Sequence, residues 1–238
     1  MSTRRSVDNE LYVLQARRLM LEVVDRLNLT HNYALESRFR SIPLYKNSPI
    51  EAVYVDDLGG KGCAFTALLG EDGVTISEFS CSRNADEKAE KKSDKLFTAS
   101  AKFGEVINLP IGQVTINPTL YFNPELVGKE IKVSKLNRDV LATAYRNRVQ
   151  MSVASKMSSI INLSLNDVVP QRADDILNTL LDVYNDDAVY DKQIVAEATA
   201  KFISERLQVI GEELHNIDGD IKSFKDKNNI VDIKTEAT

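Results

Sequence analysis

Two cysteines, Cys63 and Cys81, are the only side chains of this sequence that could form a covalent cross-link. The residues between them predict a hairpin around Glu71-Asp72-Gly73, because a three-residue loop that ends in glycine is a common hairpin connection. That loop length places Cys63 directly opposite Cys81, where Cβ atoms lie about 4.5–5.5 Å apart, close to disulfide range. The sequence therefore predicts a disulfide in an oxidising compartment, and the alternative is two buried free thiols.

The other residues that could carry chemistry are few. His31 and His215 are the only histidines, so neither a catalytic triad nor a histidine-based metal site is expected. Gly59-Gly60-Lys61-Gly62 lacks the spacing of a phosphate-binding loop, and we interpret it as a turn. Asp56-Asp57, at the end of a predicted strand, is the acidic pair that could bind a cation. We expect no catalytic, cofactor-binding or metal site, and no enzyme in this chain.

Length and composition favour a folded body. The chain has 238 residues, of which 43% are hydrophobic and 27% charged, values near those of ordinary globular proteins. A net charge of −5 provides no broad positive field, so we expect no nucleic-acid partner. The sequence contains neither an apolar run of about 20 residues nor a secretory signal. We therefore expect a soluble chain, or a fragment of a membrane protein without its transmembrane helices.

The elements that would position these residues are both helices and strands. Apolar residues at steps of three and four predict a helix over residues 8–27, and Val53 and Val55 suggest the end of a strand. Residues 82–95 contain no apolar residue larger than alanine and predict a mobile loop. Further strands are predicted at 106–109, 113–117, 120–122, 131–133 and 159–165, with a helix at 137–149. This order predicts an α+β fold, with a mixed sheet and packed helices in a body of residues 1–168.

A very long C-terminal helix is predicted after this body. Pro170 is suited to a first helical position, and no strong breaker follows before Asn228-Asn229. A helix of roughly 57 residues would measure about 85 Å at 1.5 Å per residue. Its first third has a wide apolar face suited to lying on a sheet. That face comprises Ala173, Ile176, Leu177, Leu180, Leu181, Val183 and Tyr184.

Further along, the apolar face narrows to a heptad stripe with alternating steps of four and three residues. Its members are Ala196, Ala200, Ile203, Leu207, Ile210, Leu214, Ile217, Ile221 and Phe224. A strict seven-residue repeat lies on one side of a helix and is typical of helices that pair with another helix. We expect residues 169–234 to form this extended helix. Its partner helix would come from a neighbouring copy of the chain or from a returning segment outside this sequence. The predicted oligomerisation seam consists of Ile203, Leu207, Ile210, Leu214, Ile217, Ile221 and Phe224.

Three stretches of the chain are similar to segments of one protein family. Leu44–Ile50 (LYKNSPI) resembles an "LYxxSPI" segment that leads into an early strand in Bacteroides-type members. Residues 158–165, followed by Pro170–Tyr184, resemble an apolar strand and the start of a long helix. Phe202–Lys225 resembles the continuation of that helix, "FI.ERL…FK". On these stretches the chain resembles the periplasmic region of bacterial polysaccharide co-polymerases. These include chain-length determinant proteins of O-antigen synthesis and transport proteins for capsular polysaccharide and exopolysaccharide, which carry a cytoplasmic tyrosine-kinase domain.

The resemblance implies a role in assembly. The parent protein would sit in the inner membrane as a ring of identical subunits. Its periplasmic region would regulate the length or export of a surface polysaccharide, beside a polysaccharide polymerase and an outer-membrane export channel, and could contact the polysaccharide. Neither the transmembrane helices nor the kinase domain of the family is present in this sequence, so autophosphorylation is not expected of it.

Two other functions are consistent with parts of the sequence. A periplasmic adaptor of the membrane-fusion type also combines a body with a long coiled coil, but it usually places the coiled coil within a lipoyl-like domain flanked by glycine-rich half-motifs, which we do not find. An enzyme with an unrecognised site would require polar residues that converge in a deep pocket.

Overall fold

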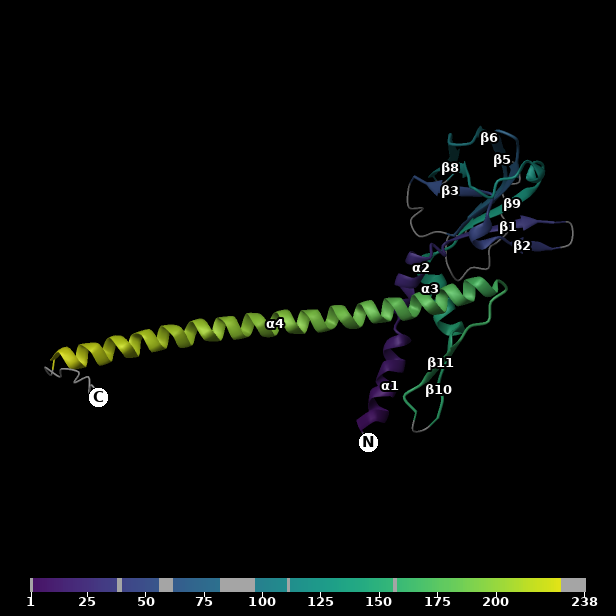
Figure 1. Ribbon diagram of the computed structural model, residues 1–238. Coiled ribbons are helices and arrows are strands. Elements are labelled where there is room, and N and C mark those ends of the chain that lie inside the picture. The colour runs from purple at the N-terminus through teal and green to yellow at the C-terminus, as the bar shows by residue number, and fades with distance from the viewer. Residues whose placement is uncertain are drawn as a thin grey trace, which may run out of the picture. The chain divides into compact units, whose positions relative to one another are not determined.

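The computed structural model describes residues 2–37, 40–55, 62–81, 97–110, 112–155 and 158–227, with side chains from Val7 onward except that of Asp226. The chain divides into two compact units, residues 1–184 and 185–238. The α+β class expected from the sequence is confirmed, including the long C-terminal helix (Figure 1). The predicted loop 82–95, Asp56-Asp57 and Gly59-Gly60-Lys61 lie outside the described residues.

The first unit contains a six-stranded sheet in the order β2-β1-β9-β4-β5-β6, in which every neighbouring pair is antiparallel. Its strands are β1 (His31–Glu36), β2 (Ser41–Pro43), β4 (Cys63–Leu69), β5 (Gly73–Cys81), β6 (Ala99–Lys102) and β9 (Glu130–Lys135). A 3₁₀ helix, η1 (Tyr45–Asn47), follows β2. In β9 buried residues alternate with more exposed ones, as expected of a strand with one face on a core, and β4 follows the same pattern except that Thr66 is also buried.

A second, three-stranded sheet has the order β3-β8-β7, with β3 (Ile50–Tyr54), β7 (Val106–Leu109) and β8 (Gly112–Pro118). Its buried side chains and those of the larger sheet form one hydrophobic cluster, the sheet core. The predicted strand 120–122 is wrong. Pro118 ends β8, and the Thr119 hydroxyl accepts a hydrogen bond from the Tyr121 N–H, which stabilises a turn. A 3₁₀ helix, η2 (Pro124–Leu126), follows.

The β4–β5 hairpin differs from the predicted one at its turn. Leu69 pairs with Val74, and the Gly70 N–H donates to the Gly73 carbonyl at 2.8 Å, so the loop contains two residues instead of three. Gly73 already belongs to β5, where a Cβ atom would lie 2.3 Å from the Ala101 carbonyl oxygen, closer than any side chain permits. This close approach to β6 explains why glycine occupies the position.

A β-bulge restores the predicted cysteine pairing further along the hairpin. Between the pairs Ala64–Ser80 and Thr66–Ser77, β5 contains one more residue than β4. Glu78, in this interval, has a φ of 55°, the left-handed conformation that bulges use. Cys63 therefore pairs with Cys81, their Cα atoms are 4.2 Å apart, and a disulfide joins them.

Helices of the first unit form a second hydrophobic cluster, the helical core. The single helix predicted over residues 8–27 is two helices, α1 (Ser2–Leu14) and α2 (Arg17–Arg26), because Ala16 is extended, with a ψ of 133°. Leu14 and Leu19 are both buried. An unbroken helix would place residues five apart about 140° from each other, so the break allows both to face the interior.

The sequence suggested that the start of the long helix α4 (Pro170–Lys227) lies on a sheet. It packs instead on α2 and α3 (Arg138–Arg148). Ile176, Leu180 and Val183 of α4 are buried among α2 and α3 residues. Figure 1 shows the three elements together beside the sheets. The helix pattern alone identified a buried face without identifying its partner.

A two-stranded ribbon precedes α4. The predicted strand 159–165 is β11 (Ile161–Ser164), and its partner β10 (Gln150–Val153) was not predicted. Met151 lies opposite Leu163 and Val153 opposite Ile161, so these four side chains share one face of the ribbon. The helix that follows has 58 residues, close to the predicted length.

Candidate association surface

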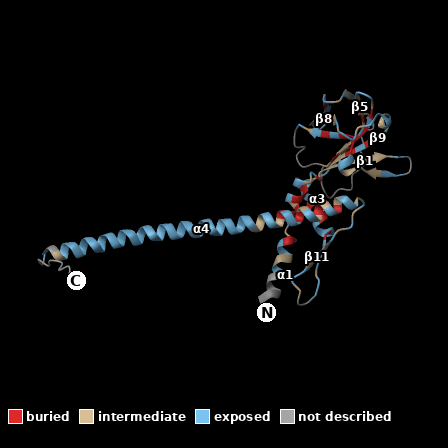
Figure 2. Cartoon of the chain, in the orientation of Figure 1, coloured by how far each residue is buried: buried red, intermediate tan, exposed pale blue. Residues whose placement is uncertain are grey.

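The heptad stripe on α4 is exposed in the second unit. Every residue from Asp191 to Phe224 is exposed, as Figure 2 shows for most of the helix. The seven side chains of the predicted seam retain between 39% exposure, at Ile210, and 64%, at Leu207. Isolated apolar side chains on a surface are ordinary, but a continuous row of this length is typical of a binding surface.

The stripe separates into the two core positions of a coiled coil. Steps of three and four assign Ala200, Leu207, Leu214 and Ile221 to position a, and Ala196, Ile203, Ile210, Ile217 and Phe224 to position d. Charged residues lie on both flanks. At position e the sequence has Glu197, Ser204, Gly211, Asp218 and Lys225, and at position g it has Thr199, Arg206, Glu213 and Asp220.

Polar side chains on α4 make contacts within the helix. Gln193 donates to Glu197 at 2.8 Å, Gln208 donates to Glu212 at 3.3 Å, and Lys201 lies 4.0 Å from Glu205. Each pair is four residues apart, a spacing that stabilises an exposed helix by a few tenths of a kcal/mol. His215 is also exposed and follows Leu214. These polar side chains are satisfied in water, whereas the stripe is not, and three apolar side chains off the stripe, Val195, Phe202 and Val209, are exposed as well.

The origin of α4 is fixed by a buried carboxylate. The side chain of Asp167 is inaccessible to solvent and accepts hydrogen bonds from Arg172, at 2.5 Å, and from the Val169 N–H, at 2.9 Å. Arg148, at the end of α3, lies 3.2 Å away. Burial opposes ionisation of Asp167, but these hydrogen bonds and the two guanidinium charges outweigh it and hold its pKa below the ordinary value.

A second contact joins α4 to the segment that contains η1. Tyr45 donates a hydrogen bond to Asp175 at 2.9 Å, and the Lys46 ammonium lies 2.6 Å from the same carboxylate. Lys46 lowers the pKa of Asp175, whereas burial and the hydrogen bond to Asp175 raise the pKa of Tyr45. Tyr45 has a φ of 45°, which is uncommon for a non-glycine residue and is maintained by its surroundings.

Near the end of the first unit, Tyr184 of α4 donates a hydrogen bond to Glu10 of α1. This bond to a carboxylate raises the pKa of Tyr184 to about 12. The hydrogen bond joins α1 to α4 one residue after Val183, the last buried residue of α4. Three separate polar contacts thus hold the first part of α4 in place.

The cysteine pair lies at one end of the sheet core. His31, Lys135 and Cys63 are successive partners across β1, β9 and β4, and Cys81 follows on β5. Lys135 lies over the ring of Tyr54, whose buried hydroxyl has no hydrogen-bond partner among the described residues. Burial and the Lys135 charge lower the pKa of His31, and its Nδ1 is hydrogen-bonded to Asn28. This arrangement is that of a packed core end and contains no nucleophile beside a base.

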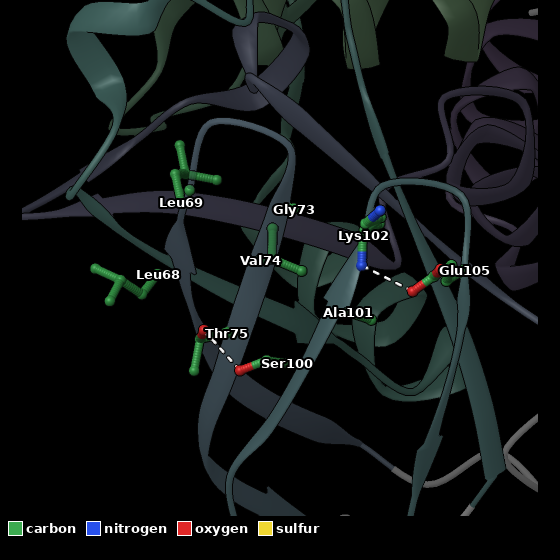
Figure 3. Close-up of a pocket in the computed structure, with 10 residues that line it drawn as sticks. Leu68, Leu69, Gly73, Val74, Thr75, Ser100, Ala101, Lys102 and Glu105 are labelled. Carbon is green, nitrogen blue, oxygen red and sulfur yellow. Dashed lines mark hydrogen bonds between the residues drawn. The ribbon is translucent and has the colours of Figure 1, made fainter.

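The described residues of the larger sheet line two open pockets. One, of about 420 Å³, is lined by β4, β5 and β6, and Figure 3 shows its polar groups already bonded to one another: Thr75 to Ser100, and the Lys102 N–H to Glu105. The other, of about 400 Å³, contains Glu36, Glu78 and Glu130. Among the described residues no group of three potential ligands could hold a metal ion.

Comparison with protein-family models and with curated protein sequences finds no match for this chain. Across the described residues, no helix is both long enough and apolar enough to cross a membrane. The residues that the sequence singled out thus fall into two groups: the seam residues form one continuous surface, and the cysteines form a cross-link elsewhere. Sequence reasoning missed Asp167 and Tyr45. For Asp167 the available signal was its position three residues before Pro170, because acidic residues are common just before the start of a helix. Nothing in the sequence indicated the contact of Tyr45.

Proposed function

We propose that this chain is the periplasmic assembly module of an inner-membrane polysaccharide co-polymerase, which regulates the chain length and export of capsular polysaccharide, exopolysaccharide or O-antigen. In this role the chain performs no catalysis. Its body is a platform, and its long helix associates with another helix when copies of the parent protein gather in the membrane. The polysaccharide polymerase and the outer-membrane channel would be its partners.

The observation that carries the proposal is the exposed heptad stripe. Burying one large apolar side chain contributes about 1.5–3 kcal/mol, so seven exposed seam residues represent a substantial driving force for association. Association of an isolated chain must also offset the loss of translational and rotational freedom. Membrane anchors would reduce this cost by raising the local concentration of copies, so the stripe suits a protein that assembles on a membrane.

Two further observations support it. The stretches that resemble the co-polymerase family converge: Tyr45, in LYKNSPI, is hydrogen-bonded to Asp175, in the helix start. The Cys63–Cys81 disulfide is consistent with an oxidising compartment such as the periplasm.

The test uses the protein at its full natural length in the cell that makes it. Leu207→Asp and Leu214→Asp, each placed in the stripe, should abolish the assembly of copies seen by cross-linking in membranes and should alter the length distribution of the surface polysaccharide. Gln208→Asp, on the polar face, is the matched control. Survival of the assembly in both stripe variants would overturn the proposed role of the stripe, and an unchanged polysaccharide would overturn the proposed pathway.

Folding of the variants is checked separately. Because the stripe is exposed, the body of each variant should keep its Cys63–Cys81 disulfide and its thermal unfolding midpoint.

A further inference from the structure

The two core positions of the heptad stripe differ in the shape of their side chains. Position a has leucine in its two central heptads, at Leu207 and Leu214. Position d has isoleucine in three successive heptads, at Ile203, Ile210 and Ile217. Isoleucine branches at Cβ, whereas leucine branches one carbon further from the backbone, so the two residues fill different spaces although their volumes are similar. The stripe therefore specifies a packing geometry in addition to an apolar surface.

This arrangement is the reverse of the one that favours two-stranded coiled coils. In a parallel pair, a side chain at d points toward the backbone of the partner helix, where the branched Cβ of isoleucine fits poorly. Parallel pairs accordingly favour isoleucine or valine at a and leucine at d. In a bundle of four the crowded geometry moves to position a, so leucine at a with isoleucine at d favours assemblies larger than a pair. Ile221 at a and Phe224 at d, in the last heptad, depart from this pattern.

A bundle of four also covers more of the stripe than a pair does. The seam side chains are between 39% and 64% exposed in the single chain. In a pair each helix contacts one neighbour and leaves both flanks of its seam in water. In a bundle of four each helix contacts two neighbours, so the seam faces an enclosed centre and positions e and g face the neighbouring helices. Three of these flanking residues are small, which lets the helices approach closely: Thr199, Ser204 and Gly211.

The direction and the register of the helices follow from the membrane. At this point the inference rests on the proposed function, because copies that stand side by side in one membrane run in the same direction. Cyclic symmetry places equivalent residues of all copies at the same height, so alignments shifted by a heptad do not arise. The parallel alignment in register is therefore the one that the flanking charges have to permit.

The flanking charges are compatible with that alignment. In parallel helices in register, position g of one helix lies beside position e of the next heptad of its neighbour. Glu213 then lies beside Asp218, which is a like-charge contact. Two other neighbouring positions carry opposite charges: Lys192 with Glu197, and Asp220 with Lys225. Each interface thus has two attractive contacts and one repulsive contact, and the balance favours association.

We infer that residues 196–224 of α4 bind the same segment of three further copies of this chain in a parallel bundle with four-fold symmetry. The bundle is about 42 Å long at 1.5 Å per residue. A cyclic arrangement closes on itself, so the membrane assembly contains four chains. The exposed apolar side chains at position c face away from its centre: Val195, Phe202 and Val209.

The first test counts the copies by cross-linking in membranes, with the protein at its full natural length. Arg206→Cys and Gly211→Cys are combined in one chain, so that each helix carries a thiol on both flanks of its seam. A side chain at position 211 meets no other atom within 4 Å in the single chain, and the native cysteines are already joined to each other. In the bundle, the thiol at 206 of one helix lies beside the thiol at 211 of its neighbour, and a short bis-maleimide joins them. A link within one helix joins no chains and only lowers the yield.

Four chains, each linked to the next, should give a ladder of products that ends at the covalent tetramer. A pair would end at the dimer, because both links would join the same two chains, and a larger ring would continue past four. Either result would overturn the inference, as would the absence of any linked product. Arg206→Cys alone and Gly211→Cys alone are the matched controls. Each should remain monomeric, because like flanks do not meet in a parallel bundle.

The second test exchanges the residue types of positions a and d in the double-cysteine chain. The exchange keeps the apolar composition nearly constant and creates the pattern of a two-stranded coiled coil. It consists of Leu207→Ile, Leu214→Ile, Ile203→Leu, Ile210→Leu and Ile217→Leu. The ladder should then end at the dimer, a reduction from four chains to two. A ladder that still ends at the tetramer would mean that side-chain shape in the seam does not set the number of copies, and would overturn the inference.

Val209→Asp distinguishes the bundle from an assembly that also uses position c. Because position c faces away from the centre, this variant of the double-cysteine chain should keep the ladder of four, and loss of the ladder would overturn the inference. Failure here is distinguishable from failure of the proposed function. If Leu207→Asp abolishes assembly while the ladder ends at two or passes four, the stripe keeps its proposed role and the bundle of four is wrong. Assembly that survives Leu207→Asp would count against the proposed function itself.

Discussion

Cys63 lies directly opposite Cys81 because β5 contains one residue more than β4 between the turn and the disulfide. At the turn Leu69 pairs with Val74, and this register alone would place Cys81 one position away from its partner, on the other face of the sheet. Glu78, with its left-handed backbone, supplies the additional residue. The disulfide therefore depends on a bulge more than ten residues away from Cys63 in the sequence.

Deletion of Glu78 should prevent the disulfide. Without the additional residue the turn register continues, and the two Sγ atoms point to opposite faces of the sheet. We expect two free thiols per chain in a titration under denaturing, non-reducing conditions, and a loss of about 3 kcal/mol in the free energy of unfolding. Glu78→Gly keeps the residue count and the backbone conformation, so it should keep the disulfide. A bridge that persists in the deletion variant would contradict this account.

Asp167→Asn should destabilise the first unit. The change leaves Arg172, which is 14% exposed, beside a neutral amide, and we expect a loss of about 3 kcal/mol at neutral pH in urea unfolding. Because the pKa of Asp167 is lower in the folded chain than its ordinary value of 3.8, the stabilisation is complete above that pH and is lost as the pH falls through the folded-state value. The difference between the two proteins should accordingly shrink in acid. Asp139→Asn, which affects an exposed pair with Arg17, should cost under about 1 kcal/mol.

Leu180→Ala and Leu181→Ala compare adjacent positions of α4. Leu180 is fully buried in the helical core and its truncation should cost about 3 kcal/mol, whereas Leu181 is 41% exposed and its truncation should cost well under half as much. Chemical denaturation followed by circular dichroism measures both. Equal losses would mean that α4 does not pack on α2 and α3 as described.

Tyr45→Phe should remove the hydrogen bond to Asp175 and lower the free energy of unfolding by about 1 kcal/mol. The ring itself remains packed, so the loss reports on the hydroxyl. Tyr121→Phe, at a half-exposed position, is the control and should change little. If Lys46 alone holds the Asp175 carboxylate, Tyr45→Phe will be neutral.

The parts of the fold that depend on local pattern could be predicted. The heptad stripe, the start of α4 at Pro170 and the strands at 106–109 and 131–133 follow from periodicity within a few residues. The break at Ala16 could not, because no glycine or proline marks it and its cause is the burial of both Leu14 and Leu19. Strand β10 was missed for a similar reason. It is only four residues long and is defined by its pairing with β11.

The candidate site divides in the same way. The seam residues were identified from the sequence because one helix repeats a local pattern, and their exposure needed only the structure of that helix. The contacts of Asp167 and Tyr45 join residues that are distant in the sequence or depend on Arg148 from another helix. A single sequence contains no sign of such pairs. The cysteine pairing was predicted with a turn one residue too long, and the bulge at Glu78 compensated for that difference.

The sheet core and the helical core have no member in common among the described residues, and adjacent residues of the chain enter different ones: Leu44 packs on the first and Tyr45 on the second. Such an arrangement permits two cooperative folding units within residues 1–184. Amide hydrogens of α2 and α3 would then exchange with solvent through openings that leave the strands protected. A pulling force on the long helix would act on the helical core, which has fewer buried residues than the sheet core, while the disulfide-linked strands remain folded.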